Sequence, residues 1–373
     1  MGLIRLFLAL AVVQEHVGLK GASFQLLNGR LAVESFYIIS GFYMALVLDR
    51  KYSTSTLVFL FNRVVRLYPA YLALTLLALL TSLSGAEILG LRNHFAQALL
   101  LVWPHLGFWG RLYAVGSNLL MEGKDLLLFL TVDPNSGLYH LGLDKDFVPA
   151  NSFQLLPQAW SLGLEFNFYL LSAWLVRLRT PWILGIIGIT YVAKVLMSFH
   201  GIYVSPWDYR FFPAELGIFL VGSLAYRVYQ GLNGPKDPWR RVAQCAALGW
   251  LACVVCHQSL PDWLGEVWAV LLTLTLLGLA LPWIFEQSKY LSWDRLVGEL
   301  SYGVYLGHLI LIDLLSLAFE RMGIPPGGLY QASVAAASIA LAWLIKRHIE
   351  RPADAWRRRL SERWLAEGTR RGR

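Results

Sequence analysis

Two ionisable side chains, Arg5 and His16, lie within the apolar stretch at the start of the chain. They are 11 residues apart, so on a helix they fall within about 20° of one face and ~16 Å apart along the axis. Titratable residues within a lipid span are costly and usually functional. Histidine suits general-base chemistry near neutral pH, so His16 is the candidate base, with a structural histidine as the alternative. Ala9 and Val12 fall between the two and predict a corridor along this face.

A glutamate, Glu34, opens the next apolar stretch. Because His16 and Glu34 are both predicted at the outer ends of neighbouring helices, we expect them to meet, with the carboxylate fixing the imidazole tautomer. The alternative is an interfacial glutamate that faces water. Gly41 lies seven residues further on, on the same helical face, and predicts a close approach of another helix.

Two arginines, Arg63 and Arg66, lie three residues apart just before Leu67-Tyr68-Pro69. Residues with this spacing are neighbours on a helix. Two adjacent guanidinium groups suit the phosphates of a nucleotide-type ligand. The alternative is the ordinary excess of positive charge on cytoplasmic loops.

Polar side chains recur at helical spacing in two further apolar stretches. The residues are Trp160, Ser161, Glu165, Tyr169 and Ser172 in the first stretch, and Ser301, Tyr305 and His308 in the second. Trp160 is expected at the outer interface, where aromatic residues gather. Each stripe alone is compatible with hydrogen bonding between helices, but together they favour a polar site inside a bundle.

The composition places these residues in a membrane protein. Hydrophobic residues make up 57% of the 373 residues and charged residues only 15%, whereas soluble domains carry about a quarter. Long apolar blocks cross a bilayer as helices, because lipid offers no partner to an unpaired backbone group. We therefore predict an all-α, polytopic bundle of about ten transmembrane helices. The expected spans are 3–20, 31–48, 67–83, 160–176, 182–199, 212–228, 242–257, 265–284, 299–319 and 328–346.

The distribution of Lys and Arg predicts the orientation. With both termini cytoplasmic, only 8 of the 32 Lys and Arg residues fall on the outer side, which agrees with the positive-inside rule. These eight are Lys20, Arg30, Arg92, Arg111, Lys124, Lys145, Arg210 and Arg321. The net charge of +8 is then a topology signal and indicates no nucleic-acid partner.

The chain divides into a membrane domain, residues 1–352, and a basic cytoplasmic tail, residues 353–373, that would lie against anionic lipid. Pro352 is expected to end the tenth span. The three cysteines, Cys245, Cys253 and Cys256, share one apolar block. That spacing favours small buried side chains over a disulfide or a metal site.

A long outer segment, residues about 84–159, interrupts the membrane domain between the third and fourth spans. Its apolar stretches Phe95–Val102 and Leu126–Val132 are too short to cross a bilayer. They predict re-entrant or interfacial helices. Long ordered segments of this kind usually have a function, and this one is placed to cover an acceptor site.

Taken in order, the motifs resemble the acyltransferase 3 family of bacterial membrane acyltransferases. The resemblance runs from Met1 to about Pro352 and rests on six separated motifs. They are Arg5 with His16, residues 34–42, Arg63 to Pro69, Trp160 to Tyr169, Ser301 to His308, and Glu350-Arg351-Pro352. The chain departs from the usual pattern at Ser35 and Tyr37, and its outer segment before Trp160 is longer than usual, which leaves the acceptor open.

The resemblance implies transfer of an acetyl or short acyl group from cytoplasmic acyl-CoA, a co-substrate and not a resident cofactor. The implied acceptor is a hydroxyl of an extracytoplasmic glycan, such as lipopolysaccharide or a lipid-linked saccharide, at the bacterial inner membrane. His16 and Glu34 would be the catalytic residues. The CoA phosphates would bind to Arg5, Arg63 and Arg66, and the pantetheine arm would pass Ala9 and Val12. The expected substrate-binding residues are Trp160, Ser161, Glu165, Tyr169, Tyr305 and His308.

Two alternatives remain open on the sequence. A transporter of a polar or lipid-linked substrate would also carry charges inside the membrane, although the halves of the chain show no repeat of the kind common in transporters. An acyltransferase acting on a small-molecule sugar hydroxyl is the other alternative. A measurement of acyl-CoA turnover would distinguish a transporter, which lacks this activity, from an acyltransferase.

Overall fold

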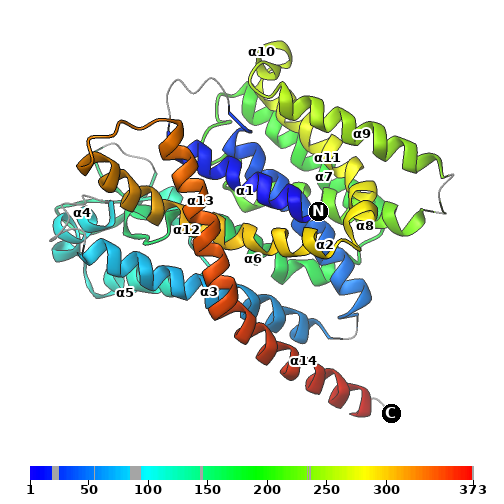
Figure 1. Cartoon of the computed structure of the whole chain (residues 1–373), viewed down its shortest axis with the longest axis horizontal. Coiled ribbons are helices and arrows are strands. Elements are labelled where there is room, and N and C mark those ends of the chain that lie inside the picture. The colour runs from blue at the N-terminus through cyan, green and yellow to red at the C-terminus, as the bar shows by residue number, and fades with distance from the viewer. Residues whose placement is uncertain are drawn as a thin grey trace.

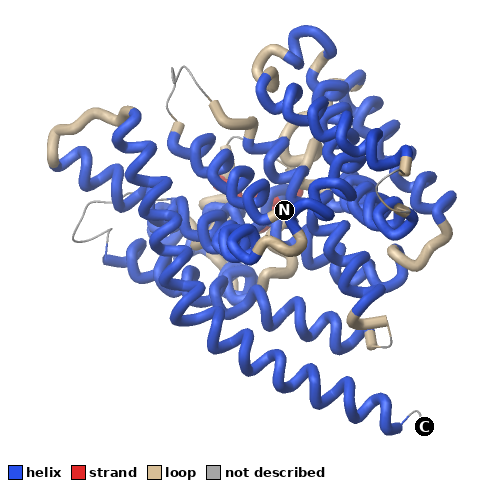
Figure 2. Tube along the Cα trace, turned by 45° about the vertical axis from the view of Figure 1, so that its right-hand side comes forward, coloured by secondary structure: helices blue, strands red, loops and turns tan. Residues whose placement is uncertain are grey.

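The computed structural model describes residues 1–18, 25–53, 55–84, 94–142, 146–232, 234 and 237–371. Helices make up most of this part of the chain, with one small sheet (Figure 2). Three basic residues expected on the outer side, Lys20, Arg92 and Lys145, lie outside the described residues, as do residues 372–373 of the tail.

Each of the ten expected spans coincides with a helix (Figure 1). These helices are α1 (Gly2–Val17), α2 (Gly29–Arg50), α3 (Thr56–Ser84), α6 (Trp160–Leu175), α7 (Thr180–Phe199), α8 (Phe212–Gly231), α9 (Pro238–Val255), α11 (Glu266–Ser288), α12 (Ser292–Arg321) and α13 (Gly328–Ile345). A short helix, α10 (Leu260–Leu264), joins α9 to α11.

Six helices within the described residues are long and apolar enough to cross a bilayer. They are α2, α3, α7, α11, α12 and the continuous helix from Gly328 to Ser361. The chain is therefore a polytopic membrane helix bundle. That α1, α6, α8 and α9 also cross the bilayer stays a prediction; α1 and α6 have only 16 residues each.

The first helix is fixed to the start of α12 by one carboxylate. Asp294 accepts hydrogen bonds from the backbone N–H groups of Gly2 (2.7 Å) and Leu3 (2.8 Å). These are among the donors that a helix leaves unpaired at its N-terminus. The carboxylate therefore caps α1 from a neighbouring helix and sets the height of α1 against α12.

The second and eighth helices cross at two glycines. A Cβ on Gly41 would lie 1.8 Å from the carbonyl oxygen of Phe219, and one on Gly222 would lie 1.8 Å from that of Ile38. No other residue type fits at such a distance, so the backbones touch directly. The close approach predicted at Gly41 is confirmed.

The outer segment folds as a small unit beside α3. It contains α4 (His94–Leu101), α5 (Phe108–Leu119) and strands β1 (Leu130–Val132), β2 (Tyr139–Leu141) and β3 (Val148–Pro149) in the order β2-β1-β3. The helix expected over Phe95–Val102 is present as α4. The helix expected over Leu126–Val132 is wrong: a 3₁₀ turn over Leu126–Phe129 leads into β1, whose residues pair antiparallel with both neighbouring strands.

The expectation that the helix ends at Pro352 is wrong, because the helix continues past this residue. A π-helical turn over Lys346–Glu350 joins α13 to α14 (Arg351–Arg371), and the two form one long rod (Figure 1). The N–H of Arg351 donates to the carbonyl of Lys346, five residues back. We attribute the passage of the proline to this wider turn, because it shifts the hydrogen-bond register where Pro352 cannot donate.

The last helix packs on the N-terminal half of α3, so residues 353–371 do not form a separate tail. Ser361 donates a hydrogen bond of 2.9 Å to the side-chain oxygen of Asn62, and Arg357 donates to the same oxygen at 3.3 Å. Asn62 directly precedes Arg63, so α14 supports the segment that carries the paired arginines.

Candidate active site

A cavity of about 480 Å³ lies among α1, α2, α3, α6 and α12. Seven of the residues proposed from the sequence for the catalytic and binding site line it, namely Arg5, Arg63, Arg66, Ser161, Glu165, Tyr169 and Tyr305. Its size falls in the range of small-molecule sites, roughly 300–1,000 Å³. Proposed residues from four separate helices therefore converge on one site.

One end of the cavity is strongly basic. Arg5, Arg63 and Arg66 all line it, although they come from two helices. Within the described residues none of the three forms an ion pair, whereas Lys346 at the same cavity pairs with Glu299 and Glu350, each at 3.2 Å. The three guanidinium groups thus remain available for an anionic ligand such as a phosphate.

The middle of the cavity contains a carboxylate with two hydroxyl donors. Ser40 donates to Glu165 at 2.6 Å, and the Tyr169 hydroxyl donates to the same oxygen. Since Ser40, Glu165 and Tyr169 all line the cavity, this polar group faces a ligand directly. Ser40 belongs to the motif of residues 34–42, but the sequence alone does not predict that it lies at the site.

A hydrogen-bonded pair of hydroxyls lies at the far end of the cavity. The hydroxyls of Ser161 and Tyr305 lie 2.7 Å apart. Both are within reach of the backbone carbonyl of Gln158, Tyr305 at 2.9 Å and Ser161 at 3.4 Å, so the two side chains share one acceptor. The Gln158 amide donates to the carbonyl of Leu306 at 2.6 Å, which fixes α12 against the start of α6.

Two histidines meet next to Tyr305, outside the lining of the cavity. The ring centroids of His16 and His308 are 4.9 Å apart, and the ring of Tyr305 is 6.1 Å from that of His308. His308 is fully buried, whereas His16 is exposed. Tyr305 thus links the cavity to the histidine pair.

The tautomers of both histidines follow from their partners. Nδ1 of His16 lies 2.9 Å from the carbonyl oxygen of Val12, and Nδ1 of His308 lies 2.7 Å from that of Tyr305. A carbonyl only accepts, so Nδ1 carries the proton in each ring and Nε2 has the free lone pair. Nε2 of His308 has no hydrogen-bond partner in the described part of the chain. His16, which is exposed, can therefore act as a base at Nε2, whereas His308 is buried.

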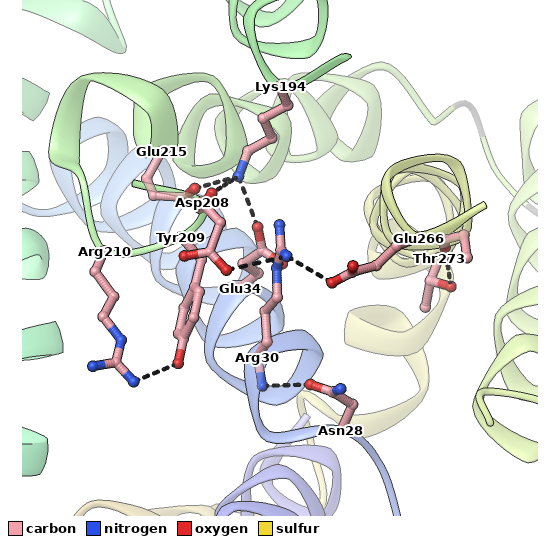
Figure 3. Close-up of polar contacts among 11 residues, drawn as sticks. Asn28, Arg30, Glu34, Lys194, Asp208, Tyr209, Arg210, Glu215, Glu266 and Thr273 are labelled. Carbon is pink, nitrogen blue, oxygen red and sulfur yellow. Dashed lines mark hydrogen bonds and ion pairs between the residues drawn. The ribbon is translucent and has the colours of Figure 1, made fainter. Parts of the chain in front are cut away.

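The structure does not bring Glu34 to His16. Glu34 lies in a buried ion cluster between α2, α7 and α8 (Figure 3), where its carboxylate pairs with Lys194 at 2.9 Å and with Arg30 at 3.4 Å. Lys194 also pairs with Glu215. Glu34 faces α7 and α8 because their charges compensate a carboxylate that would otherwise be buried alone. The side chain that contacts the His16 ring is His308, in place of the expected Glu34.

Sequence reasoning did not include Lys194 and Glu215, although a signal was present. Lys194 is a lone charge inside the apolar stretch 182–199, and Glu215 lies near the start of another. Intramembrane charges call for a partner. The pairing itself depends on how helices are arranged and is not encoded in spacing along the chain.

The corridor predicted beside Ala9 and Val12 is also corrected. Both residues are buried, and neither lines the cavity. The cavity instead follows α2 and α6, past Phe36, Tyr37 and Ser40. The small residues of α1 serve its close packing against α12, which leaves no free space on that face.

Trp160 packs against the segment between α7 and α8, and its expected position at the membrane interface stays a prediction. Its side chain is buried, its ring lies 5.4 Å from that of Tyr209, and the guanidinium of Arg210 lies 4.9 Å from its centroid. Trp160 does not line the cavity but directly precedes Ser161, which does. It therefore anchors the start of α6 below the loop that joins α7 to α8.

The fold and the site define a polytopic membrane protein with an internal ligand cavity. Residues 1–347 match the family model described as an acyltransferase domain. The chain belongs to the acyltransferase 3 family, and it is an acyltransferase of the membrane. This membership disfavours the transporter alternative. Comparisons with curated proteins and with solved structures gave no match.

Proposed function

We propose that the protein is an O-acyltransferase that moves an acetyl or other short acyl group from acyl-CoA to a saccharide hydroxyl. The observation that carries the proposal is one cavity with three arginines at one end and Tyr305, the neighbour of the histidine pair, at the other. A CoA thioester matches this arrangement, because its anionic nucleotide suits the arginines and its reactive carbonyl, at the other end of the molecule, would lie near the histidines.

The orientation proposed is that predicted from the charges, with both termini cytoplasmic in the bacterial inner membrane. The basic end of the cavity then faces the cytoplasm, where acyl-CoA is found, and the exposed side of His16 faces the acceptor. Support comes from the position of Arg5 and His16 at opposite ends of α1, ~16 Å apart along its axis. The acceptor is then an extracytoplasmic glycan.

The chemistry follows from the free lone pair on His16. Nε2 takes the proton of the acceptor hydroxyl as the oxygen attacks the thioester carbonyl. The C–S bond of the resulting tetrahedral centre breaks, and the leaving thiolate takes the proton back from the imidazolium. The products are the sugar ester and free CoA thiol, and no net proton is released. General-base help of this kind contributes about 10²–10⁴-fold.

His308 and Glu34 have supporting roles in this proposal. His308 lies against the ring of His16 and holds its own Nδ1 proton on the backbone of α12, so it positions His16. Glu34 acts at a distance, by holding the outer end of α2 to α7 and α8 through Lys194. Glu165, Ser161 and Tyr169 contact the arm of the donor.

The test is thioester turnover by the purified protein in lipid nanodiscs, measured as release of thiol and label from radiolabelled acetyl-CoA. His16→Ala should lower turnover by about 10²–10⁴-fold. His200→Ala is a matched control, because Nδ1 of His200 makes the same kind of bond to a carbonyl four residues back, at 2.8 Å. Wild-type turnover in His16→Ala refutes the assignment, as does an equal loss in both variants.

A further inference from the structure

A second cavity, of about 290 Å³, lies between α3 and the two helices of the outer segment, α4 and α5. We call it the α3–α5 groove; Figure 1 shows α5 lying along α3. The lining is almost wholly apolar and includes Leu72, Leu76, Leu79, Leu99, Trp103 and Leu119. It shares no residue with the cavity that holds the arginines.

The α3–α5 groove is open to lipid. Leu72 and Leu76 line it and yet are 42% and 57% exposed, on a helix long and apolar enough to span the bilayer. Val115 and Leu119 of α5 also line it and are 48% and 55% exposed. Apolar side chains at membrane depth face hydrocarbon. The occupant that suits such a groove is therefore a hydrocarbon chain.

A cation lies on the wall of this groove. The guanidinium of Arg111 is 5.6 Å from the ring centroid of Trp103, a lining residue, and donates to the carbonyl of Pro104 at 3.2 Å. Arg111 is exposed and forms no ion pair among the described residues. A guanidinium with free donors beside an apolar groove complements a chain that ends in a phosphate.

One short segment of the chain connects the wall of the groove to the active site. Leu155 lines the groove, and its N–H donates to the side chain of Asn118 at 2.8 Å. Three residues further on, Gln158 holds both Leu306 and Tyr305 of α12. One short segment thus forms the groove wall and fixes the helix that carries His308.

We infer that the α3–α5 groove binds the single isoprenoid or alkyl tail of a phosphate-linked saccharide, with Arg111 on the phosphate. This inference rests on the proposed function, and it names the acceptor class as a lipid-linked glycan. At about 290 Å³ the groove is at the small end of ligand pockets, which suits one chain better than the two of a phospholipid. The tail keeps the saccharide at the membrane, on the side where His16 is exposed.

The experiment uses the full chain in phosphatidylcholine nanodiscs with a diazirine-bearing polyprenyl phosphate as the photoprobe. Leu76→Trp fills the groove and should lower labelling of α3 and α5 several-fold. Leu80→Trp is the matched control, because Leu80 is 53% exposed on the same helix but does not line the groove. It should label as wild type. Arg111→Gln should weaken labelling by the phosphate while leaving labelling by the neutral polyprenol unchanged.

Three results overturn the inference: equal labelling of the two tryptophan variants, label located away from α3 and α5, or loss of the label when phosphatidylglycerol is added in equal amount. The last result would assign the groove to bulk phospholipid. Thioester turnover of wild-type protein is measured in the same nanodiscs with a polyprenyl-phosphate-linked sugar as the acceptor. Its absence would refute the proposed acyl transfer, while groove labelling is decided separately by the variants.

Discussion

Replacing Arg63 by alanine should weaken binding of acyl-CoA through its phosphates. The Arg63 side chain is only 8% exposed, lines the cavity and forms no ion pair among the described residues. Its Nε has no hydrogen-bond partner in that part of the chain. The substitution therefore leaves no carboxylate uncompensated, so its effect should fall on the ligand and much less on folding.

The magnitude follows from one charge-assisted hydrogen bond. Such a bond contributes about 1.5–3 kcal/mol, and each 1.4 kcal/mol is about tenfold in affinity. Arg63→Ala should therefore raise the KM for acetyl-CoA by about 10- to 150-fold. The rise should shrink at high salt, because screening weakens the wild-type contact as well. Arg63→Lys keeps the charge but loses the planar fork, so its KM should lie between the two.

A truncated donor separates binding from damage to the fold. Acetyl-pantetheine has the thioester but lacks the nucleotide phosphates, so its KM should be the same in wild type and Arg63→Ala. The assay is thiol release in nanodiscs with both donors. An equal rise of the KM for both donors would show that Arg63 supports the fold. An unchanged KM for both donors would show that Arg63 contributes only to membrane topology. Either result refutes phosphate binding by this residue.

Three further predictions follow from the described contacts. Lys194→Met removes the cation that the fully buried carboxylates Glu34 and Glu215 share, leaving Glu34 only its longer pair with Arg30. It should therefore destabilise the protein by about 3–5 kcal/mol in mixed-micelle unfolding; a loss below 1 kcal/mol would contradict a buried cluster. His308→Phe keeps a ring against His16 but removes Nε2, so kcat should fall while the KM for acetyl-CoA stays constant; the reverse pattern would exclude a role in the chemical step. Burial lowers the pKa of Lys124 to about 7, below its value in the unfolded chain. As the pH falls from 10 to 7 the unfolded chain gains a proton on this residue that the folded protein binds weakly, so the free energy of unfolding decreases. Lys124→Met should relieve about 4 kcal/mol of this penalty near pH 7 and little near pH 10, and a gain that does not change with pH would refute it.

Much of the fold could be predicted because hydropathy and helical spacing are local properties. Each of the ten expected spans coincides with a helix, and Ser161, Glu165 and Tyr169 line one cavity because residues four apart share a helical face. The family could be identified for the same reason, since its motifs are short and occur in a fixed order.

What the sequence left open depends on contacts between distant segments. Glu34 turns toward Lys194, which is 160 residues away, and no local pattern states which side of α2 meets α7. The strand β1 forms only because two other short strands lie beside it. The helix continues past Pro352 because a wider turn absorbs the missing donor, and a single-sequence rule for proline predicts the opposite.

The hydroxyl pair of Ser161 and Tyr305 has a consequence for the energised membrane. A water-filled passage through a bundle would let protons and small ions run down their gradient, and the cell would lose the energy stored there. These two hydroxyls lie 2.7 Å apart at the wall of the cavity that holds the arginines, and neither histidine lines that cavity. In the proposed function a donor thioester therefore reaches His16 only when packed side chains move, so the passage need not stand open to water between turnovers.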